Sequence, residues 1–432
     1  MAAAAILAIV FVLNLLLAWL QSEATPRAFE VDGQAISNPV AVPGIPRVAL
    51  LSMFAWHAVS FDAEVALPQG EVPFGSSLEF SVTSAVMLGL ALAGYLLFRA
   101  GKRLAEPGLG WFSGVRGVQV ALIYAASMFV LAVVAGFDIS LADFAPAGEA
   151  GQDAPQSLSV RPSLAGAFLM PFLLATVAAG AGALSGRALP RHRAARLALA
   201  GISGGWRAAW LAVALSSVGF LIVAALNPDE TRAYLEIIPG GGLARALLVV
   251  ATLLLLPNVG TGIAAAAMGG SFNVTALGDS CAVISYLQFP HGVGQPGPDA
   301  SCALPIDLGP APFQYMLFLL VPLAATIAGG WLASQRVGAT RREEGAFAGA
   351  IIALPFALWL WMLALLARLG YSAGGFIPFQ VQVWIGPGLL STVLIALLWG
   401  AAGGAIGGAL GARNASGPGI SPGPPAKLPG EI

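Results

Sequence analysis

Long apolar segments with almost no charged residues are the feature that most restricts how this chain can fold. A helix needs about 20 apolar residues to cross the hydrocarbon core of a bilayer, and eight segments meet that requirement. Of the 432 residues, 58% are hydrophobic and only 9% are charged, whereas soluble domains carry roughly 25% charged residues. The chain must therefore be an integral membrane protein, and we predict an all-α, polytopic helix bundle. The eight predicted spans are residues 3–20, 80–99, 117–137, 164–186, 208–226, 313–334, 346–367 and 387–411.

Two further apolar segments do not fit a simple crossing. Residues 48–59 are too few to span a bilayer, and residues 243–270 are interrupted near their middle by Pro257 in the sequence LLPNVGTG. Because proline and glycine disfavour a continuous helix, we predict that both segments are re-entrant and that 243–270 is a broken hairpin. The alternative is one crossing at 243–270 and a weaker one at 275–290. That second segment contains Asp279 and Pro290, and charged groups in lipid are costly.

Basic residues in three loops predict the orientation of the chain. Cytoplasmic loops of membrane proteins carry an excess of Lys and Arg, so these three loops should be cytoplasmic. Both termini are then cytoplasmic, and we expect a multi-pass protein of the plasma membrane. A cleaved signal peptide at the start is the alternative, although no basic residue precedes the first apolar segment. The basic residues of the three loops are Arg99, Lys102, Arg103 and Arg116; Arg187, Arg191, Arg193, Arg196 and Arg207; and Arg336, Arg341 and Arg342.

Two short motifs suggest that one unit is built twice. Ser60-Phe61-Asp62 and Ser271-Phe272-Asn273 each follow an apolar segment and precede a span that ends in a basic loop. Each half has four predicted spans, so the copies would share one orientation. This predicts a parallel repeat about a pseudo-two-fold axis along the membrane normal. The alternative is that apolar hairpins merely resemble one another. The predicted parts are 1–186 (first repeat), 187–207 (basic linker), 208–411 (second repeat) and 412–432 (disordered tail).

Signatures of catalysis are absent from the sequence. No glycine-rich loop ends in Lys-Ser or Lys-Thr, so no P-loop is present, and no serine-hydrolase elbow is found. The three histidines are too scattered to share a metal with ligand geometry, and no predicted span has an acidic residue, lysine or histidine in its middle. A basic stripe for nucleic acid is also lacking. We therefore expect no enzyme activity, no cofactor and no metal.

The candidate functional site is an outward-opening cavity between the two motifs. Histidine can bind ligands or sense pH, but His57 could instead be an interfacial residue bonded to loop backbone. Asn258 could offer a ligand site at a helix break or simply cap a helix. Cys281 and Cys302 share one predicted outer loop, where a disulfide could form, with free thiols as the alternative. The predicted cavity residues are His57, Ser60, Asp62, Asn258, Ser271 and Asn273.

The second half carries a family resemblance. The segments LPNVGTGIAAAAMGGSF and CALPIDLGPAP, together with LFRAGKRLA in the first half, resemble the actinobacterial multi-pass membrane family that includes PerM, a permease-like protein linked to cell division and envelope maintenance. The resemblance implies a plasma-membrane protein with a role in division. It implies no catalytic residue.

Two functional hypotheses follow. The first is a structural or regulatory component of the division or envelope machinery, with the lipid bilayer and membrane proteins as partners; small-residue helix faces suited to close packing favour it. The second is a permease-like carrier of a small, weakly charged solute that uses the two re-entrant segments. An intramembrane enzyme is the least favoured reading, because the sequence carries no catalytic constellation.

Overall fold

The computed structural model describes most of the predicted membrane region and the strands that join its helices. All structural statements below concern these residues. The described residues are 2–24, 28–31, 34–37, 44–66, 77–83, 85–104, 112–140, 157–185, 193–229, 231–232, 242–276, 279–285, 317–374 and 381–415.

Each half of the chain alternates helices with pairs of strands. In the N-terminal half the elements are α1 (Ala2–Ala24), β1 (Ala28–Val31), β2 (Gln34–Ser37), α2 (Ile45–Ala55), β3 (Phe61–Ala66), β4 (Ser77–Thr83), α3 (Met87–Leu104), α4 (Phe112–Ala135), β5 (Phe137–Ser140), β6 (Ser157–Pro162) and α5 (Leu164–Ser185). In the C-terminal half they are α6 (Arg193–Leu226), α8 (Gly242–Ala267), β7 (Ser271–Ala276), β8 (Asp279–Ser285), α9 (Leu320–Val337), α10 (Arg342–Ala350), α11 (Ala353–Ala367), β9 (Leu369–Gly374), β10 (Val381–Pro387) and α12 (Leu389–Ala415). Apart from the β1–β2 hairpin, and with α10 and α11 counted as one unit, the two halves run in the same order.

Seven helices are long and apolar enough to cross a membrane, as judged over the described residues. This confirms the polytopic helical bundle. The helix α1 contributes a shorter apolar stretch, Ala3–Trp19, and α3 ends in the basic residues Lys102 and Arg103. The seven spans are Val115–Ala135, Leu164–Ala183, Arg193–Leu226, Val249–Ala267, Leu317–Val337, Arg342–Ala367 and Leu389–Ala412.

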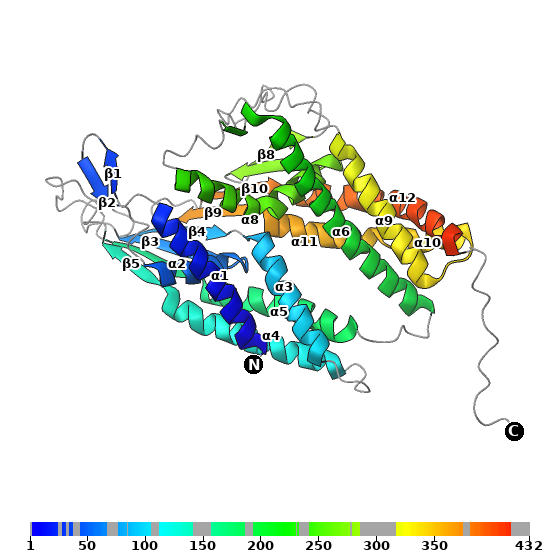
Figure 1. Ribbon diagram of the computed structural model, residues 1–432, viewed down its shortest axis with the longest axis horizontal. Helices are drawn as coiled ribbons and strands as arrows, with labels where there is room; N and C mark the ends of the chain where they lie inside the picture. Colours follow the sequence, from blue (N-terminus) through cyan, green and yellow to red (C-terminus); the bar gives the residue numbers. More distant parts are fainter. Residues whose placement is uncertain are drawn as a thin grey trace.

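An eight-stranded antiparallel sheet joins the two halves. Its strand order is β5-β6-β3-β4-β9-β10-β7-β8, so the four N-terminal strands lie beside the four C-terminal ones and β4 pairs with β9. Figure 1 shows the helices of the N-terminal half (blue to cyan) and of the C-terminal half (green to red) as two groups, with the strands between them toward the left of the view. The purely helical prediction missed this sheet.

Several predicted boundaries are wrong. The span predicted at 80–99 begins with strand β4, and α3 starts only at Met87. The predicted break at Pro257 does not occur, because α8 continues through this residue. Proline removes the N–H that would donate to the carbonyl of Leu253, four residues earlier. Ser217 Oγ donates to Leu256 O (3.2 Å) and Thr261 Oγ1 to Pro257 O (2.8 Å), so these hydroxyls bind carbonyls beside the proline and not the one that it frees.

Two predicted connecting segments are partly helical. Residues from Arg193 onward, predicted as part of the linker 187–207, form the first turns of α6, and α12 extends to Ala415 into the segment predicted as a tail. The remainder of that segment, 416–432, lies outside the described residues.

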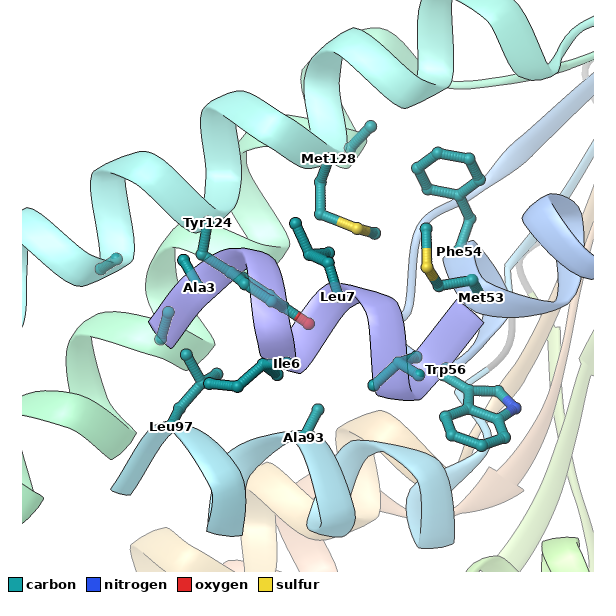
Figure 2. Packing of buried hydrophobic residues seen from close by; sticks show 14 of the residues in the cluster. Ala3, Ile6, Leu7, Met53, Phe54, Trp56, Ala93, Leu97, Tyr124 and Met128 are labelled. Atoms are coloured by element: carbon teal, nitrogen blue, oxygen red, sulfur yellow. The ribbon is translucent and has the colours of Figure 1, made fainter. Parts of the chain in front are cut away.

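The core is divided between the two halves. Buried side chains of α1 to α5 form one cluster, and buried residues of α6, α8, α11 and α12 form another. Figure 2 shows the first cluster: Tyr124 projects from α4, Ile6 from α1 and Leu97 from α3, while Met53 and Trp56 lie at the end of α2. Met87, at the start of α3, belongs to the second cluster and so ties the halves together.

Candidate functional site

The same helix-to-strand turn occurs at the ends of α2 and α8. After α2, Val59 N–H donates to Phe54 O (3.2 Å) and Ala58 N–H to Ala55 O (3.3 Å); Ala58 has a positive φ of 56°. This pattern of two bonds around a left-handed residue is the Schellman motif. Alanine is strained in this conformation, so the surrounding packing must hold it there.

The turn after α8 repeats this geometry with a residue better suited to it. Gly270 N–H donates to Ala265 O (2.9 Å) and Gly269 N–H to Ala266 O (2.8 Å), and Gly269 has a φ of 101°. Glycine adopts positive φ without steric cost. The two Ser-Phe motifs follow these turns directly, so they mark the same local structure twice.

The strands that leave the two turns also have the same register. Phe61 pairs with Pro162, and Phe272 pairs with Pro387. Ser60 O accepts a hydrogen bond from Ser163 N–H (2.8 Å), as Ser271 O does from Gly388 N–H (2.7 Å). Each motif therefore connects a helix end to the start of another helix, α5 in one half and α12 in the other.

The turn after α8 lies against neighbouring helices of the C-terminal half. Ser217 Oγ bonds to Leu256 O, and a Cβ on Gly260 would touch Val213 O, so α8 runs antiparallel to α6. Met268, at the tip of α8, packs in the cluster that contains Ala209 from the middle of α6 and Phe356 of α11. The tip of α8 thus packs among α6 and α11, and the chain leaves it as strand β7.

The tip of α2 carries the one predicted site residue that is fully enclosed. His57 is 1% exposed; its Nδ1 lies 2.7 Å from Met53 O and its Nε2 2.7 Å from Tyr124 Oη. A carbonyl can only accept, so Nδ1 carries the proton, and in the neutral ring Nε2 accepts from the tyrosine hydroxyl. Both partners are satisfied, which makes this pair a buried polar anchor between α2 and α4.

The tip of α8 is anchored by the apolar side chain of Met268 and by a hydrogen bond from Trp399 Nε1 to Met268 O (3.0 Å). Met268 occupies the position before Gly269 that His57 occupies before Ala58, and it shares a cluster with Phe356. In the N-terminal half, Gly117 of α4 faces α5, and Tyr124 lies seven residues after it. In the C-terminal half, Gly349 of α10 faces α12, and Phe356 lies seven residues after it. By position in the two halves, Met268 and Phe356, which belong to one cluster, thus correspond to His57 and Tyr124.

Asn258 links the two halves of the molecule. Its Oδ1 accepts from Met87 N–H (3.1 Å) and its Nδ2 donates to Ala85 O (2.6 Å). Val86 N–H, from the same turn, donates to Ala55 O at the end of α2 (3.2 Å). Asn258 therefore does cap a helix, but the helix is α3 of the other half. The short segment 85–87, before and at the start of α3, therefore bonds to α8 through Asn258 and to α2 through Ala55 O.

We expect Asn258→Ala to lower the free energy of unfolding by about 1–2 kcal/mol, because it removes a helix cap and leaves a partly buried carbonyl unpaired. Asn227→Ala is the matched control. Asn227 directly follows α6, and its Nδ2 donates locally to Val223 O, which already accepts from Asn227 N–H. Thermal unfolding of both variants in detergent tests this. Equal losses in the two variants would contradict a linking role for Asn258.

The other predicted site residues lie in the sheet. Asp62 is exposed on β3, and Asn273 on β7 has a buried Oδ1 with no hydrogen-bond partner. Ser271 Oγ and Asn273 Nδ2 both lie beside Gly388, at the start of α12. Strands β4, β9 and β10 separate β3 from β7, so the two motifs are not neighbours. The structure brings His57 and Asn258 near one turn and leaves Asp62 and Asn273 apart.

Two predictions cannot be placed fully. Cys281 lies in β8, whereas Cys302 lies outside the described residues, so the disulfide stays a prediction. Within the described part of the chain, no three His, Cys, Asp or Glu side chains are grouped so that they could hold a metal ion.

Comparison with known protein families, curated proteins and solved structures finds no match to this chain. Its function must therefore be argued from the geometry above.

Proposed function

We propose that this chain is a non-catalytic plasma-membrane protein that serves as a structural or regulatory component of cell division or envelope maintenance. The observation that carries this proposal is the filling of both helix tips. His57 and Met268 are buried and anchored to the neighbouring helices. A carrier would use these elements to expose a central binding site. Filled and anchored tips favour a rigid scaffold that acts through partners.

The proposal includes internal duplication. The shared element order, the paired Schellman turns and the matching strand registers all support a parallel repeat. The strand order does not fit the predicted two-fold axis, because a two-fold would place the same strand of each copy side by side, β4 with β8 or β5 with β9. The units follow one another head to tail in the sheet, with β4 against β9. We infer that each copy holds one re-entrant helix, α2 or α8.

The proposal also includes the orientation. Basic residues lie at the helix ends away from the sheet, for example Lys102 and Arg103 at the end of α3 and Arg336 in the last turn of α9. By the excess of basic residues on the cytoplasmic side, the sheet would face outward. Partners in the envelope would then meet the sheet, and cytoplasmic partners the basic helix ends.

A deletion strain tests the function. We expect filamentous or misshapen cells with normal uptake of solutes, and restoration by the wild-type gene. A matched complementation with the variant His57→Met/Tyr124→Phe, which carries the residue types of the second tip, should restore shape equally well. Normal shape with selective loss of one solute's uptake would contradict the proposal and support the permease-like carrier.

A further inference from the structure

In each half, the side chain of one arginine packs against a glycine at the boundary between the helix bundle and the sheet. In the N-terminal half, a Cβ on Gly136 would lie 3.0 Å from Arg161 Cγ; in the C-terminal half, a Cβ on Gly386 would lie 2.7 Å from Arg368 Cγ. Arg161 precedes Pro162, as Gly386 precedes Pro387, and Gly136 precedes β5, as Arg368 precedes β9. The arginine thus lies in β6 in the N-terminal half but before β9 in the C-terminal half, and the glycine occupies the other position of each pair. Each half therefore has one guanidinium at the equivalent site.

The two guanidinium groups differ in their countercharge. Arg161 Nη2 lies 3.6 Å from Asp138 Oδ1. Asp138 is the second residue of β5, and the second residue of β9 is Gly370, so the C-terminal half has no carboxylate at this strand position. Trp384 pairs with Gly370 in the sheet and its ring covers that glycine. The Arg368 Cζ lies 5.5 Å from the centre of this ring.

The Arg368 guanidinium has a donor without a partner among the described residues. Among the described residues it has no ion pair, and its Nε is buried without a hydrogen-bond partner. Burial lowers the pKa of Arg368, but arginine keeps its charge in proteins, and the end of α11 favours a cation. Stacking on an aromatic ring uses the face of the guanidinium and leaves its edge, with the paired donors, for an oxyanion.

We propose that Arg368 and Trp384 form a binding site for a phosphate group, which supplies the negative charge that Asp138 supplies in the other half. The site fits a lipid headgroup. Arg368 comes directly after the span Arg342–Ala367, where tryptophan and arginine commonly lie at the membrane interface. Leu365, Leu369 and Ile385 beside it are 44%, 44% and 37% exposed and offer apolar contacts for acyl chains. This site is independent of the proposed function.

The test compares Arg368→Gln with Arg161→Gln in the purified full-length protein. The probes are phosphatidylglycerol in mixed detergent micelles and, separately, inorganic phosphate, with thermal unfolding as the readout because a ligand of the folded state raises Tm. We expect phosphatidylglycerol to stabilise the wild type and Arg161→Gln alike, and the half-saturating lipid concentration to rise about tenfold or more in Arg368→Gln, since one charge-assisted contact accounts for that factor.

A second variant guards against misfolding of the first. Gly370→Asp/Trp384→Ser rebuilds the residue types of the N-terminal half, where Asp138 pairs with Ser159, and should weaken lipid binding as strongly. Stabilisation by inorganic phosphate that depends on Arg368 would support the same site with a soluble phosphate as its ligand. Unchanged lipid binding in both variants, or an equal loss in Arg161→Gln, would overturn the proposal.

Discussion

Replacing Gly404 with leucine is expected to prevent the C-terminal half from packing. Gly404 lies in α12 where α9 and α10 converge, and a Cβ on Gly330 or on Gly349 would touch its carbonyl oxygen. A Cβ on Gly404 itself would lie 2.5 Å from Gly349 O and 2.9 Å from Ile352 Cγ1. Backbones this close tolerate only small side chains. Overpacking costs 1–3 kcal/mol at well-packed sites and occasionally more. Here the backbone of α10 and the buried side chain of Ile352 must both move, so we expect a loss of about 4 kcal/mol or more.

Thermal unfolding and size-exclusion chromatography in detergent measure this effect. Gly180→Leu is the control, because a Cβ at Gly180 meets nothing within 4 Å, and it should melt like the wild type. If Gly404→Leu and Gly180→Leu behave alike, the glycines reflect only the composition of the chain.

The N-terminal half shows the same close contacts. A Cβ on Gly101 of α3 would touch Ala179 O of α5, as one on Gly330 of α9 would touch Gly404 O of α12. Likewise, a Cβ on Gly182 would touch the carbonyl of Phe98, and one on Gly407 that of Ile327. The small-residue faces predicted from the sequence therefore do pack closely. They do so within each half, where α5 meets α3 and α4, and α12 meets α9, α10 and α11.

Segment length and hydropathy were enough to predict most of the helices, because crossing a bilayer imposes a simple requirement on each segment by itself. The sheet does not follow from such a rule. Strand β3 reads FDAEVA and pairs with two strands from other parts of the chain, and strand formation depends on those neighbours more than on local preference. The antiparallel pair β4–β9 joins residues far apart in the sequence.

The candidate site was predictable only in part. The repeated Ser-Phe motif identified the two turns, because it is local. The residues that anchor them were missed: Tyr124 is 67 residues from His57, and only the fold brings them together. Each half has one arginine packed against one glycine, but at swapped sequence positions. An alignment of the two halves therefore places Arg161 opposite Gly386 and Gly136 opposite Arg368, and the shared guanidinium site cannot be seen in the sequence. Proline misled the prediction at residue 257, because α8 continues through it.

Removing the imidazole of His57 is expected to cause the other large loss of stability. His57 and Tyr124 are both fully buried, so His57→Ala leaves a cavity and a tyrosine hydroxyl without its partner. Cavities of this kind cost 2–5 kcal/mol and an unpaired buried polar group 1–3 kcal/mol. Since the two effects overlap, we expect a loss of about 3–4 kcal/mol, measured as the change in unfolding free energy or, where unfolding is irreversible, as the order of Tm values.

The corresponding pair in the other half supplies the decisive control. His57→Met/Tyr124→Phe introduces the residue types of Met268 and Phe356 and removes both polar partners at once, and such replacements can be nearly neutral. We expect the double variant to lose about 1 kcal/mol or less, whereas Tyr124→Phe alone, which leaves His57 Nε2 unpaired, should lose about 1–2 kcal/mol. A double variant as unstable as His57→Ala would contradict the equivalence of the two tips. A stable double variant that fails to restore cell shape would instead mean that the hydrogen bond between His57 and Tyr124 serves the function and not the fold.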